Sequence, residues 1–449
     1  MKRFSNFVSS LIAATITAGM LFIPGVGIQV NAADGIAINK VNFPNTKFRE
    51  YVKRFDLNSN DVLSQDEIDL VTEIKVAGYG INSLTGIKHF TSLKVLDCSS
   101  NQLTTLELGD NTKLLELYCS SNGLTTLDLS SNKLLSILEC QTNSLKSLNV
   151  KECTNLKYLT CSSNDLSALD VSSLTRLDTL DCTKCTKTSL TSLDLSKNTA
   201  LRSLVCRGNG LSSVDTSKNS KLKYLDCSEN ALSTLDVSLN PNLVVLFCSN
   251  TGLKELDLKN NINLKELDCS YNSFESLNID NLAALMILNC SHNPLTSLEI
   301  SNNNELVKVH CEFCKLPNFS IIMNDNVREL YINNNELTWI SVSGISLETL
   351  DCSNNKLTEL DLRYQRDLIE LSCHDNQIES IEHLYSNKMI AKNLIDFSDM
   401  INFVLDKFES NPTFLDNIAN KYDNQSEFSK VMVSPLSYST RLITPLSAL

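Results

Sequence analysis

The sequence contains sixteen cysteines, and most of them recur at a fixed interval. Cys98, Cys119, Cys140 and Cys161 stand twenty-one residues apart, and the series continues as far as Cys373. Thiols at a regular spacing could form disulfides, hold a metal ion or supply nucleophiles. Which of these they do depends on the elements that carry them.

A second group of residues with chemical potential is a run of oxygen ligands near the N-terminus. Residues 56–67 match the spacing of a calcium-binding EF-hand loop, in which oxygens at positions one, three, five, seven, nine and twelve bind the ion. The candidate ligands are Asp56, Asn58, Asn60, the carbonyl of Val62, Ser64 and Glu67.

This loop departs from the usual pattern at its sixth position, where Asp61 replaces glycine. Aspartate tolerates a left-handed backbone at modest cost, so the site survives the change. With only two ligating carboxylates, we predict weak calcium binding, in the range of about 10⁻⁴ to 10⁻³ M. The alternative is a loop that caps the fold without a metal.

Motifs for catalysis are absent from the sequence. There is no H-E-x-x-H, no G-x-S-x-G and no glycine-rich phosphate loop. The five histidines are scattered, and neither His310 nor His374 has an evident nucleophile beside it. We therefore expect no catalytic residues and no enzyme activity. A hydrolase that acts on peptide or glycan remains the less favoured alternative.

The cysteines belong to a repeat of twenty-one residues, L-x-x-L-x-C-x-x-N-x-L-x-x-L-x-L-x-x-N-x-x. Fourteen copies can be counted, and Ile332 replaces the cysteine in one of them. We call the cysteine position the rung. An insertion near 187–189 and a one-residue deletion before Cys352 shift the register. The other cysteines replace repeat asparagines: Cys185 and Cys314 three residues after a rung, and Cys153 thirteen after.

The repeat predicts short strands that stack into a solenoid. In L-x-C the leucine and cysteine point to one side of a strand, and the residues between them point to the other. One coil cannot bury its apolar side alone, whereas stacked coils share a continuous core. Parallel thiols in a column do not converge as disulfides or metal sites require. We therefore expect free, buried thiols that pack as small hydrophobes, with disulfides as the alternative.

This repeat resembles the leucine-rich repeat family, whose signature is L-x-x-L-x-L-x-x-N/C-x-L with cysteine here in place of the third leucine. Within that family it is most similar to the internalin J-like proteins of Gram-positive bacteria, and the resemblance covers roughly residues 40–383. It implies an α/β fold: a right-handed solenoid with a curved parallel β-sheet, a helical N-terminal cap and a small helical C-terminal segment. It also implies a secreted or cell-surface protein that acts in adhesion.

Four segments are predicted along the chain. Residues 1–32 have the basic start, the short apolar run and the small residues of a signal peptide, with a retained membrane anchor as the alternative. Residues 33–70 form the EF-hand-like cap, since Phe48, Tyr51, Val52 and Phe55 have helical spacing. The solenoid follows over 71–383. Residues 384–449 contain helical patterns at 393–408 and 413–424.

The charge of the chain limits its partners. The net charge of −13 becomes more negative once Lys2 and Arg3 leave with the signal peptide, so nucleic acid is an unfavourable partner. No further apolar run long enough to span a membrane follows. The sequence ends without the Leu-Pro-x-Thr-Gly sorting signal that family members commonly carry. We expect an extracellular monomer. Any association with the bacterial cell surface is expected to be non-covalent.

A column of acids recurs on the side of the coil opposite the strands. Its carboxylates must be solvated or bonded to local backbone, or else bind cations. The column is Glu107, Asp128, Asp170, Asp194, Asp215, Asp236, Asp257, Glu299 and Asp361, with Asn149 and Asn278 as interruptions.

The stretch from 247 to 331 differs most from the serine-rich and acidic strands around it. Exposed aromatic side chains among polar groups are typical of a contact with a protein or a glycan. The candidate partner-binding residues are Phe247, Tyr271, Asn289, His292, His310, Phe313 and Tyr331. We interpret the chain as a binding or adhesion protein that recognises an extracellular protein or glycan on its concave face. The alternative is a purely structural surface protein.

Overall fold

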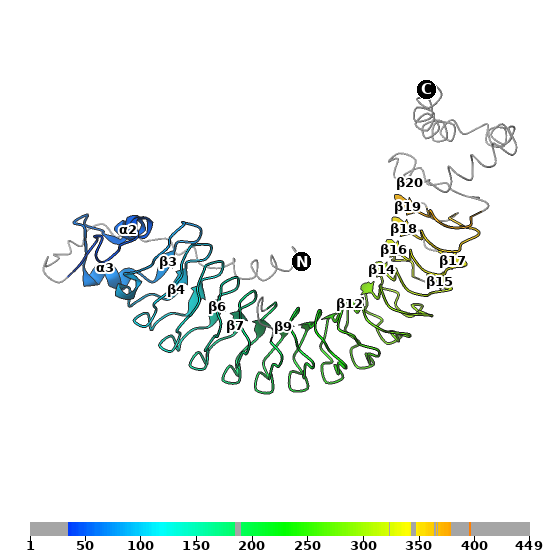
Figure 1. Cartoon of the computed structure of the whole chain (residues 1–449), viewed down its shortest axis with the longest axis horizontal. Helices are drawn as coiled ribbons and strands as arrows, with labels where there is room; N and C mark the ends of the chain where they lie inside the picture. Colours follow the sequence, from blue (N-terminus) through cyan, green and yellow to red (C-terminus); the bar gives the residue numbers. More distant parts are fainter. Residues whose placement is uncertain are drawn as a thin grey trace, which may run out of the picture.

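The structure is a computed structural model that describes residues 35–378 and 395–396, except 185–189, 323, 343–346, 363, 364 and 366. The predicted signal peptide, the insertion near 187–189 with Cys185, and nearly all of the C-terminal segment lie outside these residues. The described chain is an arc of stacked coils with one long sheet along its inner side (Figure 1). The predicted curved solenoid is confirmed.

The sheet has sixteen strands, and neighbouring strands are parallel. From one end, the order is β20-β19-β18-β16-β14, followed by every strand from β13 to β3 in turn. The strands are β3 (Glu73–Lys75), β4 (Val95–Asp97), β5 (Glu116–Tyr118), β6 (Ile137–Glu139), β7 (Tyr158–Thr160), β8 (Thr179–Asp181), β9 (Ser203–Val205), β10 (Tyr224–Asp226), β11 (Val245–Phe247), β12 (Glu266–Asp268), β13 (Ile287–Asn289), β14 (Lys308–His310), β16 (Glu329–Tyr331), β18 (Thr349–Asp351), β19 (Glu370–Ser372) and β20 (Ile395–Asp396). On the outer side, β15 (Asn318–Ser320) pairs in parallel with β17 (Trp339–Ser341) (Figure 1).

From β3 to β19, each strand of the long sheet buries its middle residue, and most of the residues on either side of it are half-buried. Leu96 in β4 and Leu117 in β5 are fully buried, and so are the rung cysteines Cys98 and Cys119 that follow them. Every described cysteine is buried. The rung cysteines therefore form part of the apolar core, as predicted.

An asparagine three residues after most rungs joins neighbouring coils. Asn122 accepts a hydrogen bond from the N–H of Leu103 in the preceding coil at 2.9 Å through its Oδ1. Its Nδ2 donates to the carbonyls of Cys98 at 3.0 Å and of Cys119 at 3.2 Å. One amide thus satisfies backbone groups of two coils, and the same pattern recurs from Asn101 to Asn376.

Two cysteines outside the rung column occupy asparagine positions and direct their thiols to the same carbonyls. Cys314 Sγ lies 3.6 Å from the carbonyl oxygen of Cys290 in the preceding coil. Cys153 Sγ lies 3.8 Å from the carbonyl oxygen of Leu129, and the equivalent Asn132 directs its amide in the same way one coil earlier. These thiols are weak substitutes for the amide donor.

The N-terminal cap covers the open end of the core. It contains α2 (Thr46–Val52), η1 (Lys53–Phe55), α3 (Gln65–Leu70) and a short antiparallel pair of β1 (Ile36–Ala37) with β2 (Val62–Leu63). Phe48 and Val52 are fully buried against the first coils, and η2 (Ile87–His89) follows in the first of these. The predicted helical spacing is therefore confirmed.

At the other end, the structure corrects the sequence prediction at two residues. The sequence pattern predicts a helix over 393–408 and an end of the solenoid at residue 383. Instead, Ile395–Asp396 forms β20, which pairs with β19 and extends the sheet. The edge of β19 presents unpaired backbone groups, and a β-branched residue such as Ile395 suits this pairing. The rest of the segment lies outside the described residues.

We predict that Asn293→Ala lowers the free energy of unfolding by about 3 kcal/mol, because it leaves several buried backbone groups without partners. Asn293 is 2% exposed and bonds to Phe274 N–H and to the carbonyls of Cys269 and Cys290. Asn293→Cys, which copies Cys314 in the next coil, should be less destabilising. Calorimetry should rank the melting temperatures wild type, then Cys, then Ala, with the exposed Asn281→Ala as control. Equal effects of Ala and Cys would contradict the role of the amide.

We also predict that the buried thiols are unreactive in the folded protein. Burial raises the pKa of Cys140 to about 12 and that of Cys153 to about 11, so neither forms the reactive thiolate at pH 8. Titration with a thiol reagent should find few reactive groups in the native protein and all sixteen cysteines after unfolding. Mass spectrometry that finds neighbouring rungs linked in pairs would refute the account.

Candidate binding surface

The second residue after each rung has a left-handed backbone, and this column borders the sheet. Its φ values lie between 45° and 69° at every described position. Most positions hold a small or polar residue, and some of these, such as Gly208, Asn250, Asn334 and Asp375, tolerate this conformation. Three consecutive coils break this pattern with large rings: Tyr271, His292 and Phe313.

These three residues, here called the aromatic strip, are stacked in parallel. The ring centroids of Tyr271 and His292 are 4.0 Å apart with an interplanar angle of 12°. Those of His292 and Phe313 are 4.3 Å apart at 11°. The outer rings, Tyr271 and Phe313, remain 55% and 50% exposed. Bulky residues at positive φ store backbone strain, which is found most often at functional sites.

A second stack lies on the sheet itself. His310 in β14 and Tyr331 in β16 are register partners, and their rings are 4.4 Å apart at 2°. Lys308 places its Nζ 5.3 Å from the centroid of the Tyr331 ring. Tyr331 Oη also donates to Glu329 at 3.4 Å. The sheet stack therefore combines flat rings with charged groups, as binding surfaces do.

Glu312 connects the sheet stack with the aromatic strip. Its Oε1 lies 2.7 Å from His310 Nδ1, and its Oε2 accepts a hydrogen bond from the hydroxyl of Ser291, which precedes His292. Burial raises the pKa of Glu312, but the bonds to His310 and Ser291 outweigh it and hold the pKa below its usual value. The ionised carboxylate therefore fixes the positions of both neighbours.

The same geometry does not form a hydrolase triad. A serine nucleophile requires histidine as its base, with the carboxylate on the far side of the histidine. Here Ser291 donates to Glu312, and the carboxylate stands between the hydroxyl and His310. The arrangement lacks the contact that would activate a nucleophile.

The remaining predicted binding residues lie on the sheet, apart from the strip. Phe247 is half-buried at the end of β11, and its ring meets that of Tyr224 edge to face at 5.7 Å. Asn289 ends β13 and accepts the N–H of Ser291 at 3.2 Å. The structure thus divides the predicted patch into three parts: the strip, the sheet stack and the Phe247 region.

The sequence interpretation missed Tyr224 and Lys308, each at the first position of a strand. In a strand, residues two apart share a face, so the first residue points the same way as the last. Applying the period of two to both exposed positions of each strand would have found them. Tyr224 contacts Phe247, and Lys308 contacts Tyr331.

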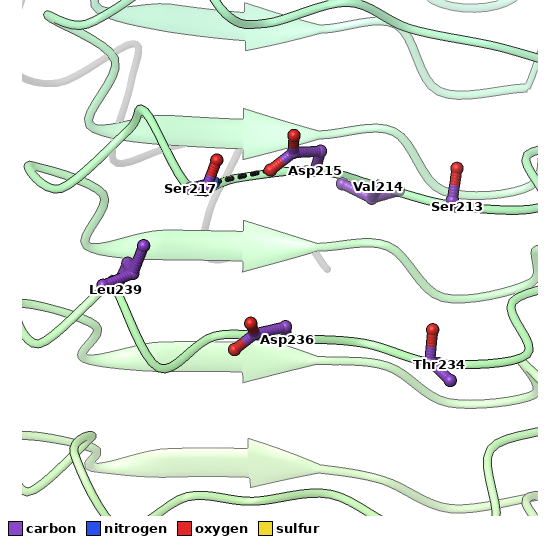
Figure 2. A pocket seen from close by; sticks show the side chains of 7 residues that line it. All are labelled: Ser213, Val214, Asp215, Ser217, Thr234, Asp236 and Leu239. Carbon is purple, nitrogen blue, oxygen red and sulfur yellow. Dashed lines mark hydrogen bonds between the residues drawn. The ribbon is translucent and has the colours of Figure 1, made fainter.

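Two open pockets of about 190 and 580 Å³ lie along the acidic column, away from the binding surface. Figure 2 shows Asp215 and Asp236 on successive coil segments in front of the strands. Their carboxylates accept the N–H groups of Ser217 and Ser238, and Asp257 pairs with Lys259 at 2.9 Å. Local backbone bonds therefore satisfy these acids, which agrees with one of the sequence-based alternatives.

Comparisons with known proteins match this architecture. Family models described as leucine-rich repeats match residues 263–285 and 345–386. A segment of 71 residues is 32% identical to internalin J of Listeria monocytogenes serotype 4b, and it covers 16% of this chain and 8% of that protein. The solved functional domain of InlJ from Listeria monocytogenes, described as including a cysteine ladder, has 30% sequence identity and a TM-score of 0.66. That alignment covers 80% of this chain and 75% of the other.

The chain belongs to the internalin J-like leucine-rich repeat proteins. The identity and coverage of the InlJ domain establish this, and the shared cysteine ladder agrees with it. A more distant likeness extends to the Arabidopsis receptor kinase HAESA in complex with the peptide hormone IDA and a co-receptor. Its TM-score is 0.59 at 20% identity over 79% of this chain and 63% of that one. This second likeness reflects the shared fold.

Within the described residues of this leucine-rich repeat protein, no helix has the length and apolar character needed to cross a bilayer. Those residues also contain no group of three or more His, Cys, Asp or Glu side chains arranged to hold a metal. A calcium ion in the N-terminal loop would therefore depend on amide and backbone oxygens as well as carboxylates.

The N-terminal loop already has the conformation of a ligand-binding turn. Asp56 accepts the N–H groups of Asn60 and Asp61, and Asp61 has a φ of 57°, as the sixth loop position requires. Asn58 and Asn60 direct their side-chain oxygens to N–H groups within the loop. The loop backbone thus accommodates aspartate where glycine is usual.

Glu67 closes the loop and caps α3. Its Oε1 accepts the N–H of Leu57 at 2.8 Å, and its Oε2 accepts the N–H and hydroxyl of Ser64. Burial raises the pKa of Glu67, but these hydrogen bonds reverse the effect and lower it overall. The carboxylate is therefore ionised at neutral pH, as a calcium ligand must be. Calcium binding itself stays a prediction.

We predict that millimolar calcium raises the melting temperature, because a ligand that binds only the folded state stabilises it. Glu67→Gln should remove most of this rise, since it takes away the bidentate ligand. Asp66→Asn removes the same charge from an exposed neighbour outside the ligand set and should keep the full rise. The calcium-dependent difference in melting temperature is the readout, because Glu67 also supports the cap without metal. An equal rise in both variants would place the calcium elsewhere.

Proposed function

We propose that this protein is a secreted or cell-surface adhesion module that binds an extracellular protein through the concave face and its bordering aromatic strip. Residues 1–32 carry the sequence pattern of an export signal, which supports the extracellular location. Ser291 and His310 are separated by Glu312, so the proposed activity is binding without turnover. A glycan partner is an outcome that the experiment below distinguishes.

The observation that carries this proposal is the aromatic strip. Tyr271, His292 and Phe313 occupy positions where glycine or asparagine would lower the strain, and two of the rings stay half exposed. Stacking offsets part of the strain, since an aromatic pair contributes about 0.5–1.5 kcal/mol. A site that needs only to close the coil would be more stable with asparagine, as in the coils of Asn250 and Asn334. Binding of a partner accounts for the rings.

Solenoids of this fold present a broad inner surface to their partners, and the HAESA structure holds a peptide hormone. The support for this chain, however, comes from its own surface. The strip, Glu312 and the sheet stack form one continuous network from the edge of the sheet to β16. Aromatic rings on such a surface are among the residues whose truncation most weakens binding.

We predict that Tyr271→Asn with Phe313→Asn weakens the binding of a selected ligand at least about thirtyfold, as expected for loss of anchors worth about 2 kcal/mol. The full chain would be screened against a displayed library of random peptides and against a glycan array, and the affinity of each selected ligand measured for both proteins. Asparagine suits the left-handed position, so the variant should fold.

The matched control is Ser100→Asn with Ser121→Asn, which introduces asparagine in the same column far from the strip. It should leave affinity within about twofold, as rim positions do. If only the glycan array yields a ligand, the partner is a carbohydrate and the proposed protein partner is wrong. Ligands that bind the Tyr271/Phe313 variant as tightly as the parent would refute the proposed site.

A further inference from the structure

A group of rings and carboxylates in the middle of the sheet lies outside the aromatic strip. In the register of β10, β11 and β12, Phe247 stands between Asp226 on one side and Asp268 on the other. Tyr224 and Glu266 stand at the first positions of the outer two strands, on the same face. We call these five residues the ring–acid cluster.

The base of this cluster is rigid. The middle residues Leu225, Leu246 and Leu267 are fully buried, so the first and third residues of each strand face outward. The rings of Tyr224 and Phe247 pack edge to face at 5.7 Å and an angle of 82°. Asp226 and Asp268 stand two strand spacings apart, about 10 Å, which leaves room for a flat group over the Phe247 ring.

Asp226 and Asp268 accept local hydrogen bonds, and among the described residues neither they nor Glu266 form a salt bridge. Asp226 Oδ1 accepts the N–H of Ser228 at 3.0 Å, and Asp268 Oδ1 accepts the N–H of Ser270 at 3.1 Å. The charge of Arg207 acts on Asp226, but Arg207 forms its ion pair with Glu229. Asp226 is only 6% exposed, so its charge is held in a poorly solvated position beside the rings.

Electrostatics make this arrangement unfavourable without a cation. Burial raises the pKa of Asp226, and the nearby charge of Asp268 adds to it, against the bonds from Ser228 and the charge of Arg207. Burial likewise raises the pKa of Glu266. The pKa of Tyr224 is raised by burial and then by the charges of Asp226, Glu266 and Asp181. Negative charge therefore accumulates around the ring pair with little to neutralise it.

We propose that the ring–acid cluster binds an arginine side chain presented by an extended, basic segment of the protein partner. This inference rests on the proposed binding role of the concave face and specifies the chemistry of the partner. A guanidinium is planar, stacks on aromatic rings and donates to carboxylates on two sides at once. Phe247 and Tyr224 supply the rings, and Asp226 and Asp268 supply acceptors on both sides.

The probe is a labelled eight-residue peptide of glycine and serine with two central arginines, and its affinity for the full chain is measured by fluorescence polarisation. Replacing the arginines by citrulline, which is neutral and of the same shape, should weaken binding by about tenfold or more. Phe247→Leu should weaken the arginine peptide more than a lysine peptide, because the flat guanidinium loses its stacking partner.

The acids are tested with a charge-matched pair of variants. Asp226→Asn with Asp268→Asn should weaken the arginine peptide about tenfold. Asp215→Asn with Asp236→Asn removes the same charge from the opposite side, where each aspartate likewise accepts an N–H two residues ahead. This control should change affinity less than about twofold. An asparagine side chain keeps one oxygen that can accept the N–H of Ser228 or Ser270, so the fold should persist at neutral pH.

Equal effects of the two aspartate pairs would overturn the inference, because binding would then reflect only the general negative field. Insensitivity to citrulline would overturn it as well. The Tyr271→Asn/Phe313→Asn variant should bind the arginine peptide within about twofold of the parent, since its rings lie outside the cluster. Failure of the aromatic strip as a binding site and failure of the ring–acid cluster are therefore separate results.

Discussion

The hydrogen bonding of the asparagine three residues after most rungs is the interaction on which this solenoid depends. A coil of this kind leaves backbone N–H and carbonyl groups pointing inward, where water cannot reach them and unpaired groups would be costly. The amide of Asn122 resolves this by bonding to the backbone of its own coil and of the coil before it. Successive coils are thereby held in strict register. Where a cysteine takes such a position, its thiol contacts the same carbonyls more weakly.

Strict register turns sequence intervals into columns in space. Residues twenty-one apart become neighbours, so Tyr271, His292 and Phe313 stack although each belongs to a different coil. The left-handed turn that releases the chain from the sheet carries these rings to the sheet border. The local backbone would prefer asparagine or glycine there, and the rings stabilise one another only as a set. The repeated coil backbone places these positions side by side, and the three rings that depart from the repeat sequence form the surface.

The pKa of an aspartate is shifted in opposite directions on the two sides of the coil. Asp236, opposite the sheet, is exposed, and hydrogen bonds from Ser238 lower its pKa. Asp226, on the sheet, makes the same bond to Ser228, yet burial beside Tyr224 and Phe247 raises its pKa overall. The difference is solvation, since water stabilises one carboxylate and packed rings surround the other. Asp236 in the acidic column is thus satisfied locally, whereas Asp226 belongs to the ring–acid cluster for which a cationic partner is proposed.

The sequence by itself determined the repeat, the rung column and the burial of the thiols, because a period of twenty-one fixes which residues face the core. It also identified the rings of the strip and the helical cap around Phe48. It did not reveal that Tyr224 meets Phe247, that Glu312 bridges Ser291 and His310, or that Ile395 extends the sheet. Those contacts depend on side-chain directions and on an open strand edge, and neither exists until the coils are stacked. Likewise, Asp226 and Asp236 are the same residue type in similar sequence contexts. Only the packing of the sheet determines that Asp226 is buried and poorly solvated, whereas Asp236 remains exposed to water.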